Sequence, residues 1–349
     1  MTNAAATFPE VIETEQDLDD VLSRPRPVLI EFMRRLQGPL VILGAGGKMG
    51  PTLAWLAHRA AAAAGRALDI FAVSRFSDDA TRCWLQERGV QTLSIDLLNR
   101  QDVQRLPDAA EVVYLVGRKF GTAENAAQTW VINTLVPAYI AERYRHSRLV
   151  VLSTGNVYPF VSVSTGGSVE TDALTPVGEY ANAVVARERV LEFFAHLAST
   201  PLTILRLNYA VELRYGVLVD IARRVHAGDS VNLTTGYLNC IWQGDANDMV
   251  LRSLGLASFP PQILNLTGPA VLSVRGLALR FGELLGRTVR FEGTESETAL
   301  LNNPARACAM LGAPATPLDR VLRWTAHWVR SGGRCLDKPT HFEVRDGRY

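Results

Sequence analysis

Several features that would point to a particular partner or compartment are missing from this sequence of 349 residues. Its four cysteines, Cys83, Cys240, Cys308 and Cys335, form no CxxC pair, and its six histidines show no HxxxH, HxH or HExxH spacing. We therefore expect reduced thiols and predict no metal site. The 36 basic and 35 acidic residues give a net charge of +1 without a basic block. This balance argues against nucleic acid or a membrane surface as a partner.

The sequence also lacks a run of apolar residues that is long enough to span a bilayer. The most apolar stretch, residues 53–73, is interrupted by His58, Arg59, Arg66 and Asp69. The N-terminus has neither the basic nor the apolar segment of a secretion signal. With 48% apolar residues the chain can bury a substantial core. These observations predict a cytoplasmic globular protein of one large domain or two small ones.

What the sequence does contain begins with a helical extension over residues 1–38. Thr14 and Asp17 resemble a capping box that opens a short helix, and a second helix is predicted to end at Gly38. We interpret this segment as a packing or oligomer arm, which leaves a homodimer open as a possibility.

From Pro39 onward, short apolar runs alternate with helix-like segments such as 49–64 and 124–144. Because these runs are apolar throughout, they are typical of strands that are covered on both faces. The alternation predicts an α/β fold with a parallel, doubly wound sheet, whose ligands lie at the carboxyl ends of the strands. The predicted strands are residues 39–43, 69–73, 91–95, 111–116 and 148–153.

The turn after the first predicted strand reads LGAGGKMG and carries Gly44, Gly47 and Gly50 in a GxxGxxG pattern. Glycine permits a tight turn, lets the backbone approach a pyrophosphate, and allows close packing of helix on strand. In this context the pattern favours dinucleotide binding over a purely structural turn. Lys48 and Met49 belong to the same turn and are included in the predicted cofactor site.

The residues after the second and third strands bear on which dinucleotide binds. An NAD site usually has Asp or Glu after the second strand, whereas this chain has Ser74 and Arg75. Arginine suits a 2′-phosphate, so NADP is favoured over NAD, although a solvated arginine is an equal alternative. Asp96 and Leu97 follow the third strand and are predicted to contact the adenine, but Asp96 could equally cap a helix.

An ordered series of motifs over residues 39–330 resembles the extended short-chain dehydrogenase/reductase family, which includes NAD-dependent sugar epimerases and dehydratases. The series comprises LGAGGKMG, VVYLVG, WVINTLVPAYIAE, LVVLSTGNVYP, VETDALTPVGEYANAVVARERV, ILRLN, IWQGDAN and ILNLTGPAVLSVRGLA. The resemblance implies a Rossmann domain over 39–210, to which 240–266 returns. It also implies a smaller C-terminal α/β substrate lobe with a tail, over 211–239 and 267–349.

The same resemblance implies roles for individual residues. Thr154 and Tyr180 take the positions of the catalytic hydroxyl and the acid/base tyrosine. The remaining implied residues are cofactor contacts at Val116, Gly117 and Asn133, and substrate contacts at Thr154, Asn156 and Asn208.

The sequence departs from the family four residues after Tyr180, where Val184 replaces a lysine. In the family that lysine binds the nicotinamide ribose and lowers the pKa of the tyrosine, which is otherwise near ~10. We considered three replacements. Lys119, after the fourth strand, is the preferred catalytic candidate, although it and Arg118 could be solvated loop charges. Arg187 ranks lower because Glu188 and Glu192 offer it local ion pairs.

A second departure is Leu238, which stands where family members that act on nucleotide sugars keep an arginine for the diphosphate. Arg214 is a further candidate, for a substrate carboxylate or phosphate, although a surface ion pair is as good an explanation. We therefore expect a nicotinamide-dependent oxidoreductase, epimerase or lyase that acts on a hydroxyl of a small sugar, sugar acid or polyol. The alternative hypothesis is a catalytically silent cofactor-binding sensor or scaffold.

Overall fold

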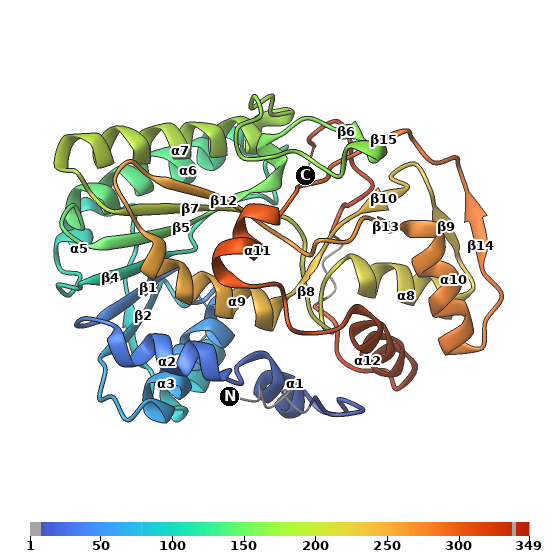
Figure 1. The fold of residues 1–349 in the computed structure, drawn as a ribbon, viewed down its shortest axis with the longest axis horizontal. Helices are drawn as coiled ribbons and strands as arrows, with labels where there is room; N and C mark the ends of the chain where they lie inside the picture. The colour runs from blue at the N-terminus through green and yellow to red at the C-terminus, as the bar shows by residue number, and fades with distance from the viewer. Residues whose placement is uncertain (1–7, 78, 337–339, 349) are drawn as a thin grey trace.

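Seven parallel strands form the centre of the molecule, as Figure 1 shows. The computed structural model describes residues 8–77, 79–336 and 340–348. Within these residues the strands lie in the order β12-β7-β5-β4-β1-β2-β3, which is the order of a doubly wound Rossmann sheet. Their bounds are β1 Leu40–Leu43, β2 Ile70–Ser74, β3 Gln91–Ser94, β4 Glu111–Tyr114, β5 Arg148–Thr154, β7 Leu202–Leu207 and β12 Gln262–Leu266.

Helices cover both faces of this sheet because successive side chains of a strand point to opposite faces. Leu40 and Ile42 of β1 pack into one apolar cluster with α3 and α9, while Val41 and Leu43 pack into another with α6 and α7. The sheet is therefore buried on both sides, which explains its continuously apolar strands. The helices on or beside it are α2 Pro27–Arg35, α3 Gly50–Ala63, α4 Asp79–Glu87, α5 Arg100–Gln104, α6 Ala126–Arg143, α7 Gly178–Ala198, α9 Gln243–Arg252 and α11 Ala305–Leu311.

A second lobe lies beyond the carboxyl ends of the strands, on the right in Figure 1. Its apolar cluster joins Val225 of α8, Phe281 of α10 and Trp324 of α12. Its elements, together with the short strands that connect it to the sheet, are β6 Val161–Ser162, β8 Ala210–Val211, α8 Val217–Ala227, β9 Ser230–Asn232, β10 Tyr237–Leu238, β11 Ile241–Trp242, β13 Leu272–Ser273, α10 Val274–Leu285, β14 Arg290–Glu292, β15 Thr298–Ala299 and α12 Leu318–Arg330.

The N-terminal segment forms the two helices that its sequence predicts. Helix α1 (Glu15–Leu22) opens with the full capping box, in which Thr14 accepts from the Asp17 backbone and Asp17 accepts from that of Thr14. Leu18 and Leu22 of α1 enter the apolar cluster of the second lobe, whereas α2 packs beside α3. This segment is thus integrated into the packing of the chain. The predicted extension begins in residues 1–7, which lie outside the described residues.

From residue 39 onward the predicted strands and helices agree with the observed ones to within two residues at their ends, whereas α2 ends at Arg35, three residues before the predicted end at Gly38. The predicted helix over 49–64 is α3, and the one over 124–144 is α6. All four cysteines are free thiols, as expected. Among the described residues, no helix combines the length and the apolar character that crossing a membrane requires.

Candidate active site

The glycine turn lies at the carboxyl edge of the sheet, between β1 and α3. Gly44 has a φ of +88°, and a Cβ there would lie 3.0 Å from Val116. A Cβ on Gly50 would lie 2.5 Å from the Ala45 backbone, so this glycine allows α3 to pack against the turn. Gly47 is different, because it is exposed and its Cβ would meet only the Gly44 carbonyl, at 3.2 Å. A side chain at Gly47 would be tight against this carbonyl and would otherwise point into the free space of the cleft.

One half of the cleft runs from the glycine turn toward β2 and β3. Arg75 has an exposed side chain there, and Ser74 and Asp96 line the same wall. Asp96 accepts from the backbone of Leu98 in a local turn, so its carboxylate stabilises the loop after β3. The predicted contacts Leu97, Val116 and Gly117 also line this half, which lies at the carboxyl ends of the strands.

The other half contains Thr154 and Tyr180. Thr154 ends β5 and is buried, Tyr180 stands in the first turn of α7, and their side chains are hydrogen-bonded to each other. Thr154 also donates to Asn156 Oδ1 at 3.2 Å. Burial raises the pKa of Tyr180, while the charge of Arg187 and the hydrogen bond with Thr154 act to lower it. The structure therefore brings together the two hydroxyls that the sequence singled out, 26 positions apart.

Two lysines line the same half of the cleft. Lys119 follows β4 and lies 5.6 Å from the centre of the Phe120 ring, and burial lowers its pKa to about 8. Lys48 donates to the Ala210 carbonyl at 2.8 Å and lies 4.1 Å above the Tyr215 ring. Burial also lowers its pKa to about 8, against the opposing charge of Glu212. Both ammonium groups therefore change charge close to neutral pH.

Asn133 and Arg187 lie beneath the floor of the cleft and are both buried. Arg187 donates through Nη1 to the Leu152 carbonyl at 2.7 Å and through Nη2 to Asn133 Oδ1, and Asn133 donates to the Arg118 carbonyl. A Cβ on Gly117 would lie 2.6 Å from Arg187 Nη2. The guanidinium thus fills the space behind the end of β4.

The expected local ion pairs of Arg187 were wrong. Glu188 lies inside the protein and binds Arg206 at 2.7 Å, while Glu192 binds Arg189 at 2.7 Å on the surface of α7. Residues one and five positions along a helix point away from a given side chain, whereas Arg187 turns toward β5. Within the described part of the chain Arg187 has no carboxylate partner, and its buried Nε has no hydrogen-bond partner.

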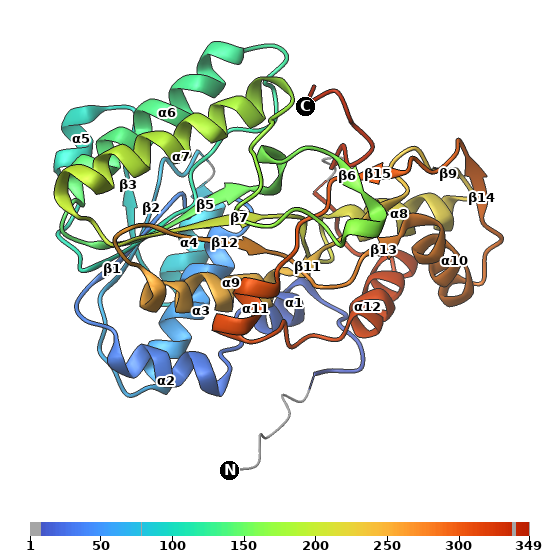
Figure 2. The same cartoon turned by 45° about the horizontal axis from the view of Figure 1, so that its top comes forward.

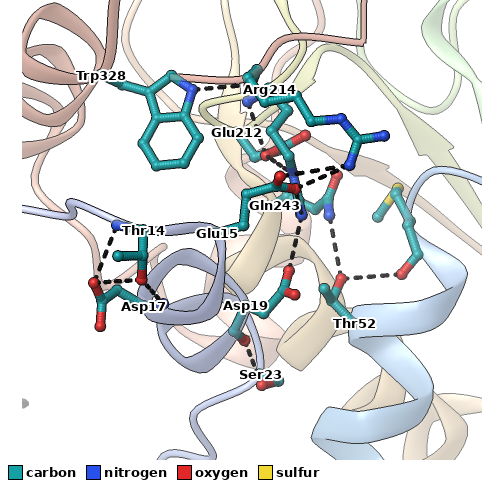
Figure 3. A network of polar contacts seen from close by, with 12 residues as sticks. Thr14, Glu15, Asp17, Asp19, Ser23, Thr52, Glu212, Arg214, Gln243 and Trp328 are labelled. Atoms are coloured by element: carbon teal, nitrogen blue, oxygen red, sulfur yellow. Dashed lines mark hydrogen bonds and ion pairs between the residues drawn. The ribbon is translucent and has the colours of Figure 1, made fainter. Parts of the chain in front are cut away.

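Arg214 belongs to a network of ion pairs with residues of α1, which Figure 3 shows. Its guanidinium is surrounded by Asp19 at 3.0 Å, Glu212 at 3.2 Å and Glu15 at 3.5 Å. These ion pairs connect α1 to the second lobe, so Arg214 is not available to a substrate. Asn208 does line the cleft, and its amide group donates to Asn239 Oδ1 at 2.9 Å.

The C-terminal tail reaches the cleft at one residue and α7 at another, which its sequence did not indicate. We call residues 340–348 the C-terminal strap; the rest of the predicted tail, residues 337–339 and 349, lies outside the described residues. Thr340 lines the cleft and donates from its hydroxyl to Asp220 at 2.6 Å. At its other end a Cβ on Gly178, which begins α7, would lie 2.5 Å from the Gly347 carbonyl. Figure 2 shows this end of the chain between α7 and the second lobe.

Comparison with known proteins identifies the family. The model of the NAD dependent epimerase/dehydratase family matches residues 40–240, which is more than half of the chain. No curated protein matches the chain significantly.

Solved structures share the fold at low identity. UDP-glucose 4-epimerase of Thermus thermophilus, solved with NAD, is 19% identical with a TM-score of 0.67, over 84% of this chain and 99% of that one. UDP-glucuronic acid 4-epimerase of Bacillus cereus, also with NAD, is 15% identical with a TM-score of 0.70, over 84% and 98%. Pal from Bacillus thuringiensis is 17% identical with a TM-score of 0.69, over 84% and 99%. The chain belongs to the NAD dependent epimerase/dehydratase family and is an NAD-dependent enzyme.

Proposed function

We propose that this enzyme oxidises a hydroxyl-bearing carbon of a small polar substrate and that it completes an epimerisation, an elimination or a net oxidation from the resulting carbonyl. The observation that carries the proposal is the hydrogen-bonded pair of Thr154 and Tyr180 in a cleft that begins at the glycine turn. The exposed Gly47 and the N-terminus of α3 fit the pyrophosphate of a dinucleotide. When bound, the nicotinamide supplies the hydride acceptor.

The protein side of this reaction is acid/base chemistry at one oxygen. The Thr154 hydroxyl orients the substrate oxygen by a hydrogen bond and stabilises charge on it. The Tyr180 phenolate accepts the proton of the substrate hydroxyl as the carbonyl forms, and the phenol returns it when a hydroxyl is regenerated. The Asn156 backbone N–H fixes Thr154, since it donates to the threonine hydroxyl oxygen at 3.2 Å and leaves the hydroxyl proton for the substrate oxygen. Lys119 lines the same cleft, and its ammonium group assists this proton transfer.

Three observations support a small substrate. The inner half of the cleft has a volume of about 280 Å³, at the lower end of the roughly 300–1,000 Å³ of ligand sites. Leu238, at the family's diphosphate-binding position, is buried in the apolar core of the second lobe. Thr340 of the C-terminal strap lines the inner half of the cleft and takes up part of its wall. A UDP-sugar, which the titles of similar structures name, is the second candidate substrate.

Arg75 supports a preference for NADP over NAD. Its exposed side chain lies beside the ribose end of the cleft, and a guanidinium binds a 2′-phosphate through charge-assisted hydrogen bonds.

The test combines cofactor reduction with product analysis. Protein loaded with NADP or NAD is incubated with sugars, sugar acids, polyols and UDP-sugars, and the absorbance of reduced nicotinamide and the stereochemistry of the products are followed. We expect turnover of a small substrate and a loss of ~10²–10⁴-fold in Tyr180→Phe. Turnover of UDP-sugars alone would contradict the substrate class, and unchanged turnover in Tyr180→Phe would contradict the mechanism.

A further inference from the structure

Position 184, where the family has a lysine, lies in surroundings that would destabilise a charged side chain. Val184 is fully buried and packs in a small apolar cluster with Val157 and Tyr158. Burying an ammonium group there would remove it from water without providing a carboxylate partner. A charge that assists Tyr180 must therefore come from another position.

Arg187 lies on the same helix and on the side that faces Tyr180, seven residues and about two turns later. Its guanidinium is anchored to the Leu152 carbonyl, and Tyr180 is bonded to Thr154, two residues further along the same strand. The two groups therefore contact the same strand two residues apart, and the charge of Arg187 acts to lower the pKa of the phenol. No carboxylate within the described residues neutralises this guanidinium, so its field reaches the phenol.

The other groups that face Tyr180 come from three elements. Lys119 follows β4, Lys48 belongs to the glycine turn, and Tyr215 precedes α8. Both lysines have a pKa of about 8 and lose their charge where a phenol begins to ionise. Arginine keeps its charge throughout this range. Arg118 lines the other half of the cleft, and Arg187 is the permanent cation whose charge acts to lower the pKa of Tyr180.

We infer that Arg187 replaces the helix lysine as the positioning residue that favours the phenolate of Tyr180 against the effect of burial, acting on the phenol from behind the cofactor cleft. This inference rests on the proposed acid/base role of Tyr180. The charge has moved from the cleft wall to a buried position, where it cannot bind the nicotinamide ribose. The two functions of the lysine are thus separated, and only the electrostatic one is retained. Gly117 makes the arrangement possible, because any larger residue would collide with the guanidinium.

The test titrates Tyr180 directly and needs no substrate. A fluorinated tyrosine, whose phenol is intrinsically more acidic, is incorporated at position 180, and its ¹⁹F resonance is followed against pH in the cofactor-free protein. Arg187→Met should raise the pKa of this phenol by about one to two units, which is the effect of removing a unit charge at roughly 6–12 Å in a medium of dielectric constant ~20. Arg187→Lys should restore most of the effect.

Two further variants make the result decisive. Arg189→Met removes an exposed charge of the same helix and should leave the titration unchanged. Arg187→Gln keeps an amide donor for Asn133 or Leu152 and replaces the Met variant if that one does not fold. A folded neutral variant with the pKa of the parent would overturn the inference. Because the titration is independent of turnover, this outcome differs from an active Tyr180→Phe, which would instead refute the acid/base role.

Discussion

Restoring the family's lysine by Val184→Lys should harm this protein. The valine is fully buried, and losing its apolar burial costs about 1.5–3 kcal/mol. The new ammonium would enter an apolar cluster without a partner, so we expect a total cost of about 3–5 kcal/mol, comparable to an uncompensated buried charge. A globular protein has only ~5–15 kcal/mol of stability to lose.

Repulsion between Arg187 and the new lysine adds to this cost, and removing Arg187 tests whether that repulsion exists. Residues three apart on a helix lie ~5–6 Å from each other, which corresponds to about 3 kcal/mol between two unit charges at an effective dielectric constant of ~20. Part of the destabilisation by Val184→Lys should therefore disappear in the Arg187→Met background. In that background the lysine should also lower the pKa of Tyr180 again.

The assay is urea unfolding of the four proteins of this double-mutant cycle, with Val184→Met as an uncharged control of similar length. The effect of the double variant on the free energy of unfolding should differ from the sum of the two single effects by a coupling free energy of about 1–3 kcal/mol. The reasoning is refuted if Val184→Lys is as stable as Val184→Met and turns over faster than the parent. That result would mean that the lysine was simply lost and that nothing has taken its place.

Three further predictions concern the cofactor. Gly47→Val should fold normally but lose dinucleotide binding in calorimetry, since its side chain would enter the space of the pyrophosphate; unchanged binding would remove the turn from the site. Arg75→Ala should weaken NADP about 10- to 100-fold, as expected for the loss of a charge-assisted bond of ~1.5–3 kcal/mol, and leave NAD unaffected. A parent protein that prefers NAD would contradict this. Cofactor affinity should fall as the pH rises through about 8, because Lys48 and Lys119 there lose the charges that attract the anionic pyrophosphate. The decrease in affinity should be smaller in Lys48→Met than in the parent.

The fold could be predicted from the sequence because each signal was local. Strands that are buried on both faces are apolar at every position, and the glycine turn after β1 has the spacing that a strand-to-helix connection requires. The capping box at Thr14 is equally local, since it involves residues only three apart. Such signals depend on few residues and survive low overall identity.

The surroundings of the site could be predicted less well because they depend on contacts between distant segments. Arg214 was a plausible substrate ligand until the structure placed Asp19, from nearly 200 positions earlier in the chain, beside it. Thr340 lines the cleft and donates to Asp220, which lies 120 positions earlier in the chain. No spacing in the sequence indicates either contact.

Arg187 shows where the sequence held a signal that was misjudged. The seven-residue spacing places Arg187 on the same helix face as Tyr180, but the sequence also offers Glu188 and Glu192 as local ion-pair partners that would neutralise it. What decides the matter is the direction of each side chain: Glu188 turns to the buried Arg206, while Arg187 reaches β5 and Asn133. A helix lysine at position 184 would have to share this space with a second cation. The valine and the buried arginine are therefore two parts of one arrangement, in which the charge lies under the cleft and the wall beside Tyr180 is apolar.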